Sequence, residues 1–169
     1  MKNLKWVKED QKYFLKNDHT LLLTLNFHAA AIADFILNEK EYLVNRKGSW
    51  NPAYYVTASG KEIIKLTHSF WGSRGKIICW DNTVYKCEYI NKGGLKVRFL
   101  DGENELFSYY LSTETKQLTI SFNIGTHMED AEKLLLLSVL GMVLFTSLAG
   151  ENFSKNDDNS TLLLLAATS

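Results

Sequence analysis

The stretch MEDAEKLLLLSVLGMVLFTSLA, from Met128 to Ala149, decides the fold of this chain. From Leu134 onward its side chains are apolar on every face that a helix would present. A helix that is hydrophobic all round is either enclosed by the rest of its protein or crosses a bilayer. The class of protein depends on which of these two arrangements holds.

Signals at both ends define this predicted helix. Thr126 to Glu129 form a T-x-x-E capping box, and Glu129 and Asp130 place negative charge at the positive end of the helix dipole. Gly150 is expected to end the helix as its C′ residue. We therefore predict one helix over residues 128–149.

The length of the apolar run favours an enclosed helix. Leu134 to Ala149 spans about 24 Å as a helix, whereas a bilayer core needs ~30 Å. The run includes Ser138 and Gly141, lacks an aromatic belt and has almost no flanking positive charge. We expect no transmembrane segment, and the small residues would let strands approach the helix closely. The alternative is a tail-anchored membrane protein in which the helix over 133–149 spans the bilayer.

The composition is that of a single globular domain. The chain has 169 residues, of which 46% are hydrophobic and 22% charged, enough to bury a substantial core. Its 19 basic and 19 acidic residues balance, so net charge provides no attraction to nucleic acid. The N-terminal residues contain no signal-peptide core. Cys79 and Cys87 flank a predicted hairpin turn, and we expect reduced thiols in a cytoplasmic protein.

Residues 4–122 carry the pattern of short β-strands. Apolar and polar side chains alternate, and turn residues separate the alternating segments. The predicted strands are Leu4–Lys8, Tyr13–Lys16, Thr20–Phe27, Ala30–Leu37, Tyr42–Arg46, Tyr54–Thr57, Glu62–Ser69, Lys76–Trp80, Val84–Ile90, Leu95–Phe99, Phe107–Leu111 and Gln117–Phe122. The segment 29–43 is predicted as a strand pair, although its alanines and the spacing of its apolar residues also suit a helix.

One predicted strand pair depends on its loop. Leu95, Val97 and Phe99 form an inward set, with Lys96 and Arg98 pointing outward. The next strand, Phe107–Leu111, would face the same interior if a five-residue loop, Asp101 to Glu105, joins the two. A shift by one residue would expose half of one set.

These elements together predict a mainly β fold with one central helix. A closed antiparallel barrel of about twelve strands is too wide for its own side chains to fill, and an apolar helix supplies the missing core. We expect a single domain over residues 1–169. It consists of a strand meander over 1–127, the central helix over 128–149, and a polar loop with a short apolar segment over 150–169.

This order of parts resembles the tubby C-terminal-like superfamily, which includes phospholipid scramblases and LURP-one-related proteins, in its uncharacterised bacterial branch. The resemblance rests on Ala30 to Gly48, Tyr54 to Lys65, Gly75 to Tyr89 and, for the helix, Leu134 to Phe145. It implies the barrel-around-helix fold and binding of phosphoinositides or other lipid headgroups. The scramblase calcium-binding and cysteine-rich segments are not recognisable, so scramblase activity is not implied.

The best candidate site is a basic cluster formed by Arg74, Lys76, Lys96 and Arg98, with Lys92 in the loop between strands. Lys96 and Arg98 would project from one strand face, and Lys76 would lie in a strand one hairpin away. Such a cluster could bind a phosphate or an anionic headgroup. The alternative is a solvated outer face that prevents aggregation. Glu88 and Glu62 lie in the same strand region and would weaken the positive field.

Other chemistry finds little support in the sequence. The four histidines have no metal-site spacing, and the segment 70–77 departs from a phosphate-loop motif at two required positions. Asp101, Glu103 and Glu105 form an acidic turn without a calcium-loop pattern. We expect no catalytic residues, metal or cofactor.

The leading hypothesis is a non-enzymatic cytoplasmic binding or scaffold protein, acting on lipid headgroups at the inner membrane surface or on a protein partner. The remaining alternative is an enzyme whose site assembles across strand ends.

Overall fold

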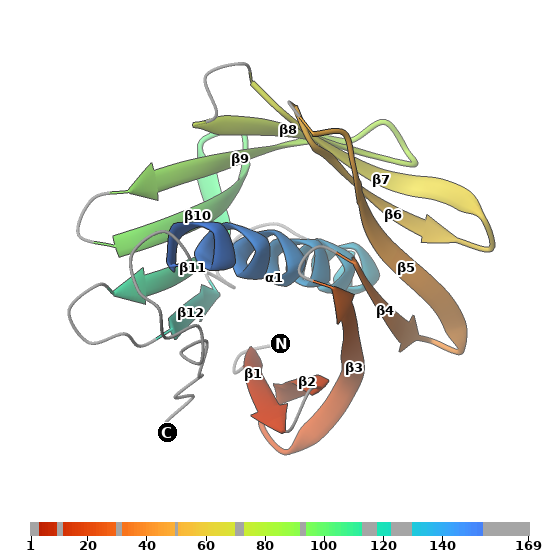
Figure 1. Cartoon of the computed structure of the whole chain (residues 1–169). Coiled ribbons are helices and arrows are strands. Elements are labelled where there is room, and N and C mark those ends of the chain that lie inside the picture. The colour runs from red at the N-terminus through yellow and green to blue at the C-terminus, as the bar shows by residue number, and fades with distance from the viewer. Residues whose placement is uncertain are drawn as a thin grey trace.

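A computed structural model describes residues 4–9, 12–29, 32–49, 51–69, 73–91, 94–112, 118–122 and 130–153. These residues form strands and one helix (Figure 1). The elements are β1 (Leu4–Glu9), β2 (Lys12–Asn17), β3 (Thr20–Ala29), β4 (Ile32–Leu37), β5 (Lys40–Lys47), β6 (Ala53–Ala58), β7 (Lys61–His68), β8 (Arg74–Cys79), β9 (Val84–Asn91), β10 (Gly94–Asp101), β11 (Asn104–Ser112), β12 (Leu118–Phe122) and α1 (Ala131–Phe153). The predicted helix cap at Thr126 to Glu129 and the predicted C-terminal segment beyond residue 153 lie outside these ranges.

The strands form one 12-stranded antiparallel sheet in which each strand pairs with its neighbours in the chain. The sheet curves around α1, which lies at the centre of the molecule (Figure 1). The prediction of a mainly β chain with one enclosed C-terminal helix is therefore confirmed. In the described part of the segment 29–43, β4 pairs with β5, and the turn residues Asn38 and Glu39 have φ of 50° and 63°, the left-handed values of a tight hairpin.

The prediction of a closed barrel was wrong. Cα atoms of β1 and β12 come within 8 Å of each other, but no hydrogen-bonded register joins these two strands in the described part of the chain. The two sides meet through core side chains instead, because the indole Nε1 of Trp6 on β1 donates to the hydroxyl of Tyr109 on β11 at 3.2 Å. That hydroxyl in turn donates to the carbonyl of Ser138 on α1 at 2.7 Å.

The helix begins and ends later than predicted. Asp130 acts as its N-cap, since the backbone N–H of Lys133 donates to Asp130 Oδ1 at 3.0 Å. At the other end the helix continues through Gly150 to Phe153. The predicted stop at Gly150 was wrong because a glycine within a helix costs only about 1 kcal/mol, which is too little to end a helix by itself.

The helix is enclosed by the sheet. Its window Ala131–Leu148, with a mean hydropathy of 1.7, is long and apolar enough to cross a membrane, but 78% of that window is buried inside the molecule. Gly141 shows how closely the sheet approaches, because a Cβ at this position would lie 2.7 Å from Tyr109 Cε2 and 3.1 Å from both Phe107 Cε2 and Phe99 Cε2. The predicted role of a small residue at this position is confirmed.

Polar tethers fix both ends of the helix in the sheet. The hydroxyl of Tyr42 on β5 donates to Glu132 Oε1 at 3.0 Å in the first turn. The hydroxyl of Tyr54 on β6 donates to Ser147 Oγ at 3.0 Å near the other end. Because the two tyrosines lie at opposite ends of one hairpin-linked strand pair, the helix runs along the axis of the curved sheet.

The inward set of β10 and β11 is confirmed, although the loop is shorter than predicted. Phe99 pairs with Phe107 and Val97 pairs with Tyr109, and the rings of Phe99 and Phe107 stack with centroids 4.5 Å apart. The strands are joined by the two-residue turn 102–103. A register shift between Phe99 and Leu100 places an extra residue in β11, and this β-bulge restores the shared inward face.

Candidate functional site

The four basic residues of the predicted site lie on the outer surface of the sheet. On β8, Arg74 and Lys76 alternate with Gly75, Ile77 and Cys79, which are buried. On β10, Lys96 and Arg98 alternate with the buried inward set of that strand. This follows from the two-residue period of a strand, which sends alternate side chains to opposite faces. The predicted outward direction of Lys96 and Arg98 is confirmed, and the binding role of all four residues stays a prediction.

Strand β9 lies between β8 and β10 and carries the acid that divides the cluster. Glu88 pairs in register with Arg74 on one side and with Arg98 on the other. Arg98 Nη2 contacts Glu88 Oε2, and Arg74 Nε lies 3.7 Å from Glu88 Oε1. The hydrogen bond from Arg98 holds the pKa of Glu88 below its usual range and raises the pKa of Arg98. Glu88 therefore remains ionised and neutralises much of the positive charge near it.

A second acid, Glu105, pairs with the two cations on β10. Glu105 Oε2 lies 3.5 Å from Lys96 Nζ and 3.8 Å from Arg98 Nη1. Lys96 and Arg98 are only about one-third exposed, at 34% and 32% of the side chain, whereas the side chain of Arg74 is 77% exposed. The predicted cluster thus separates into an internally paired half on β10 and a solvent-accessible half on β8.

Lys76 differs from the other three predicted residues. It lies directly opposite Lys86 on β9 and Thr67 on β7. Lys86 Nζ is paired with Glu103 Oε1 at 3.0 Å, whereas no acidic group lies within ion-pair distance of Lys76 in the described ranges. Like charges placed directly opposite each other on neighbouring strands destabilise the pair. An anion bound between Lys76 and Lys86 would relieve this repulsion.

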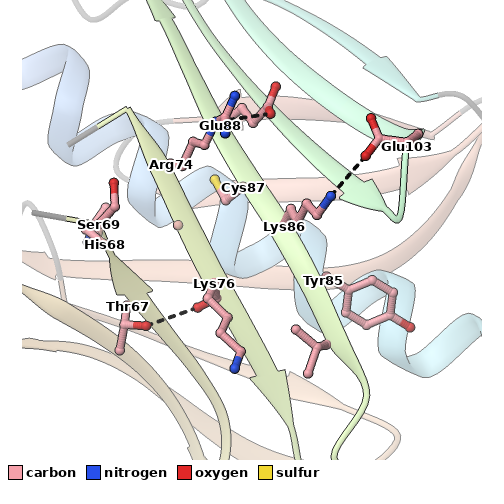
Figure 2. Close-up of a pocket in the computed structure, with 12 residues that line it drawn as sticks. Thr67, His68, Ser69, Arg74, Lys76, Tyr85, Lys86, Cys87, Glu88 and Glu103 are labelled. Carbon is pink, nitrogen blue, oxygen red and sulfur yellow. Dashed lines mark hydrogen bonds and ion pairs between the residues drawn. The ribbon is translucent and has the colours of Figure 1, made fainter. Parts of the chain in front are cut away.

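A half-open depression of about 500 Å³ lies at this place (Figure 2). It contains both solvent-accessible members of the cluster, Arg74 and Lys76, and neither of the two residues on β10. Its lining residues are Thr67, His68, Ser69, Arg74, Gly75, Lys76, Val84, Tyr85, Lys86, Cys87, Glu88 and Glu103. Figure 2 shows Arg74 beside Glu88, and Lys86 directed at Glu103.

Gly75 lies on the inner face of β8, behind the depression. A Cβ on this residue would lie 2.8 Å from Leu66 Cδ1, 3.2 Å from the Thr67 carbonyl oxygen and 3.4 Å from Cys87 Cβ. Any larger residue would crowd the buried side chain of Leu66 and the backbone of β7, so this position favours glycine.

The side chains of the depression suit an anion. Its basic side chains and the hydroxyls of Thr67 and Ser69 can donate hydrogen bonds to phosphate oxygens. Burial raises the pKa of the Cys87 thiol to about 12, so Cys87 is not a nucleophile near neutral pH. Within the described ranges no group of three His, Cys, Asp or Glu residues could hold a metal ion.

Sequence reasoning missed two features of this site. The alternation of β9 could have predicted that Lys86 points outward, but only the β8–β9 register shows that it lies opposite Lys76. Glu105 was assigned to an acidic turn, whereas it lies on β11 and pairs with both cations of β10. Lys92, predicted to join the cluster, falls outside the described residues. Glu62 was expected to weaken the field, but the acids in contact with the cluster are Glu88 and Glu105.

The fold and site together describe a mainly β protein with an enclosed helix and a basic depression on its outer surface. No family model matches the chain, and neither a curated protein nor a solved structure matches it.

Proposed function

We propose that this chain is a non-enzymatic binding protein of tubby-like fold that recognises the phosphate of a lipid headgroup at the inner surface of the cytoplasmic membrane. The observation that carries this proposal is the cross-strand pair of Lys76 and Lys86 beside Arg74. Two lysines paired in register, of which only Lys86 has an acidic partner, form a site that an anion would stabilise.

The tubby-like part of the proposal is supported by the order and placement of the elements. An antiparallel meander precedes an apolar helix, and the sheet curves around that helix. The stretches that carry the resemblance correspond to β4 and β5, to β6 and β7, to β8 and β9, and to α1. The open edge between β1 and β12 is a departure from a closed barrel.

Within this proposal, the predicted residues have two different roles. Arg74 and Lys76 contact the ligand together with Lys86, because they line the depression and are exposed. Lys96 and Arg98 act as positioning residues, because they hold Glu88 and Glu105 on the neighbouring strands. Arg98 in particular satisfies Glu88, which leaves the exposed guanidinium of Arg74 able to turn toward a phosphate.

The proposal is tested with two double variants. Arg74→Gln with Lys76→Gln removes the accessible half of the cluster, and Lys96→Gln with Arg98→Gln removes the paired half. Each is titrated with glycerol 3-phosphate by NMR and sedimented with vesicles of phosphatidylcholine containing phosphatidylserine. Lys40→Gln with Lys61→Gln, at exposed positions that begin β5 and β7, is the matched control for loss of two charges.

We expect the Arg74 and Lys76 variant to lose at least about tenfold in affinity for both probes, since each lost charge-assisted hydrogen bond contributes roughly 1.5–3 kcal/mol. The control should stay within about threefold of the unchanged chain. The β10 variant should lose affinity, but less than the Arg74 and Lys76 variant, because Glu88 then competes with the ligand for Arg74. Equal binding by all variants, or loss in the control alone, would exclude Arg74 and Lys76 as the binding residues and would end the proposal.

A further inference from the structure

The turn between β8 and β9 carries apolar side chains in solvent. Trp80 is 48% exposed and Val84 is 46% exposed. Ile78 lies directly opposite Val84 in the β8–β9 register, and it is partly exposed. These three residues, which we name the hairpin tip, form an apolar end on the hairpin that also carries the basic depression.

The backbone of the hairpin tip is tightly bonded. The N–H of Cys79 donates to the carbonyl of Thr83 at 3.0 Å, and the N–H of Asn82 donates to the carbonyl of Cys79 at 2.9 Å. The N–H of Thr83 also donates to Asp81 Oδ1 at 3.1 Å. The exposed Trp80 is therefore held on a rigid turn, so its exposure is built into the structure.

Positive charge surrounds the hairpin tip. Lys76 and Lys86 are the next outward pair along the hairpin, and Lys65 lies opposite Ile78 on β7. Two of the acids nearby are already paired. Asp81 Oδ2 lies 2.6 Å from Lys133 Nζ, and Glu103 Oε1 lies 3.0 Å from Lys86 Nζ. Asp81 consequently offers little repulsion to an approaching negative surface.

We propose that the hairpin tip inserts into the interface of an anionic lipid bilayer. Tryptophan favours the headgroup level of a bilayer, and lysines can bury their aliphatic stems while their ammonium groups reach the phosphates. An apolar tip flanked by lysines complements a surface that is uniformly negative above an apolar layer. This inference rests on the proposed function, because it names the bilayer as the source of the phosphate that the depression binds.

The spacing along the hairpin supports simultaneous contacts. Lys76 and Lys86 lie two residues behind Ile78 and Val84, which is about 7 Å along a strand. An interfacial element buries its apolar face by roughly 5–10 Å at the headgroup boundary. When Val84 and Trp80 enter the acyl boundary, the two lysines are therefore at the depth of the phosphates.

The test uses the full chain and the double variant Trp80→Ser with Val84→Ser. The matched control is Ile36→Ser, which removes an apolar side chain that is 58% exposed on β4. Binding is measured by sedimentation with vesicles of phosphatidylcholine alone and of phosphatidylcholine containing phosphatidylserine. In a second measurement, brominated lipids quench tryptophan fluorescence, and the difference between the unchanged chain and Trp80→Phe isolates the signal of Trp80.

We expect the tip variant to lose about tenfold in vesicle binding, because an exposed tryptophan and valine no longer leave water. Binding of glycerol 3-phosphate by the single variant Trp80→Ser, which keeps the lining residue Val84, should be unchanged. Brominated lipids should quench Trp80. The Ile36→Ser control should bind vesicles like the unchanged chain.

Two results would overturn the inference. One is unchanged vesicle binding by the tip variant, and the other is the absence of quenching at Trp80. In either case the proposed function stands if Arg74→Gln with Lys76→Gln still abolishes phosphate binding. If instead the tip variant loses vesicle binding while the Arg74 and Lys76 variant binds normally, the inserted tip is supported and the proposed phosphate site fails. A hairpin tip that contacts a protein partner would show no binding to either kind of vesicle, which also overturns the inference.

Discussion

Lys133 Nζ lies 2.6 Å from Asp81 Oδ2, and this contact joins the first turn of α1 to the turn between β8 and β9. The side chain of Lys133 is only 8% exposed. Burial by itself lowers the pKa of Lys133, but the hydrogen bond to Asp81 and the charges of the neighbouring groups together outweigh it, and the pKa is raised. Lys133 Nζ also lies 5.2 Å from the centroid of the Trp80 ring. The enclosed helix and the exposed hairpin tip are thus linked through one buried cation.

Removing the acid from this pair should cost more stability than removing the base. Asp81→Asn leaves a buried ammonium without its closest partner, whereas Lys133→Met leaves a carboxylate that is 40% exposed and can be hydrated. Urea unfolding of both variants should therefore show a larger fall in the free energy of unfolding for Asp81→Asn. The opposite order would mean that the pair is not buried in solution.

Acid should destabilise the chain through the paired carboxylates. Hydrogen bonds from Lys133 and Arg98 lower the pKa of Asp81 and of Glu88, respectively. A carboxylate with a lowered pKa in the folded state contributes stability that is present above its unfolded pKa, near 4, and is lost as the pH falls through the folded value. The free energy of unfolding should therefore decrease between about pH 5 and pH 3. Glu88→Gln should show a smaller decrease over that range, and an identical decrease would contradict the role of Glu88.

Both thiols should be protected from thiol reagents under mildly alkaline conditions. Burial raises the pKa of Cys79 to about 11 and that of Cys87 to about 12. The fraction of thiolate at Cys79 near pH 8 should therefore be roughly a hundredfold below that of a free cysteine. A thiol reagent such as DTNB should react slowly with the folded chain and rapidly with both cysteines in urea. Fast reaction of two thiols without denaturant would contradict this burial.

Gly141→Ala should destabilise the chain although alanine favours helices. The added Cβ would lie 2.7 Å from Tyr109 Cε2, and overpacking of this kind costs about 1–3 kcal/mol. The better helix propensity of alanine returns only about 1 kcal/mol. Ser138→Ala is a suitable control, because the Ser138 hydroxyl bonds within the helix, to the Leu134 carbonyl at 2.8 Å. If a thermal melt gives Gly141→Ala a higher melting temperature than the unchanged chain, the sheet does not pack closely against the helix at this position.

Leu140→Asp should abolish soluble folding. Leu140 is fully buried, and an unpaired charge in the core costs several kcal/mol, a large part of the stability of a domain. Leu21→Asp, at a position that is 51% exposed, is the control and should fold. Soluble yield and a circular dichroism melt measure both. A normal melt for Leu140→Asp, together with resistance of the unchanged chain to carbonate extraction from membranes, would favour a helix that spans a bilayer.

The sequence alone was sufficient to predict the order of strands and helix and the face on which their side chains lie. The two-residue alternation of Leu95 to Phe99 places Lys96 and Arg98 on the outer surface, whatever strand lies beside them. The all-apolar character of Leu134 to Phe145 requires an enclosed environment in a soluble fold. Both inferences depend on local backbone geometry and on hydrophobicity, which neighbouring residues in the chain determine.

Only the tertiary structure decided which cations are paired and which are accessible. Glu88 contacts Arg74 and Arg98 because the registers of β8, β9 and β10 place the three residues side by side. Phe107 lies opposite Phe99 because a bulge in β11 shifts the register that the two-residue turn would otherwise give. The separation of β1 from β12 likewise depends on the curvature of the whole sheet. Registers, bulges and curvature arise from packing between distant segments around α1. The pattern along one segment therefore determines the face on which a side chain lies, whereas the tertiary structure determines which residues it contacts.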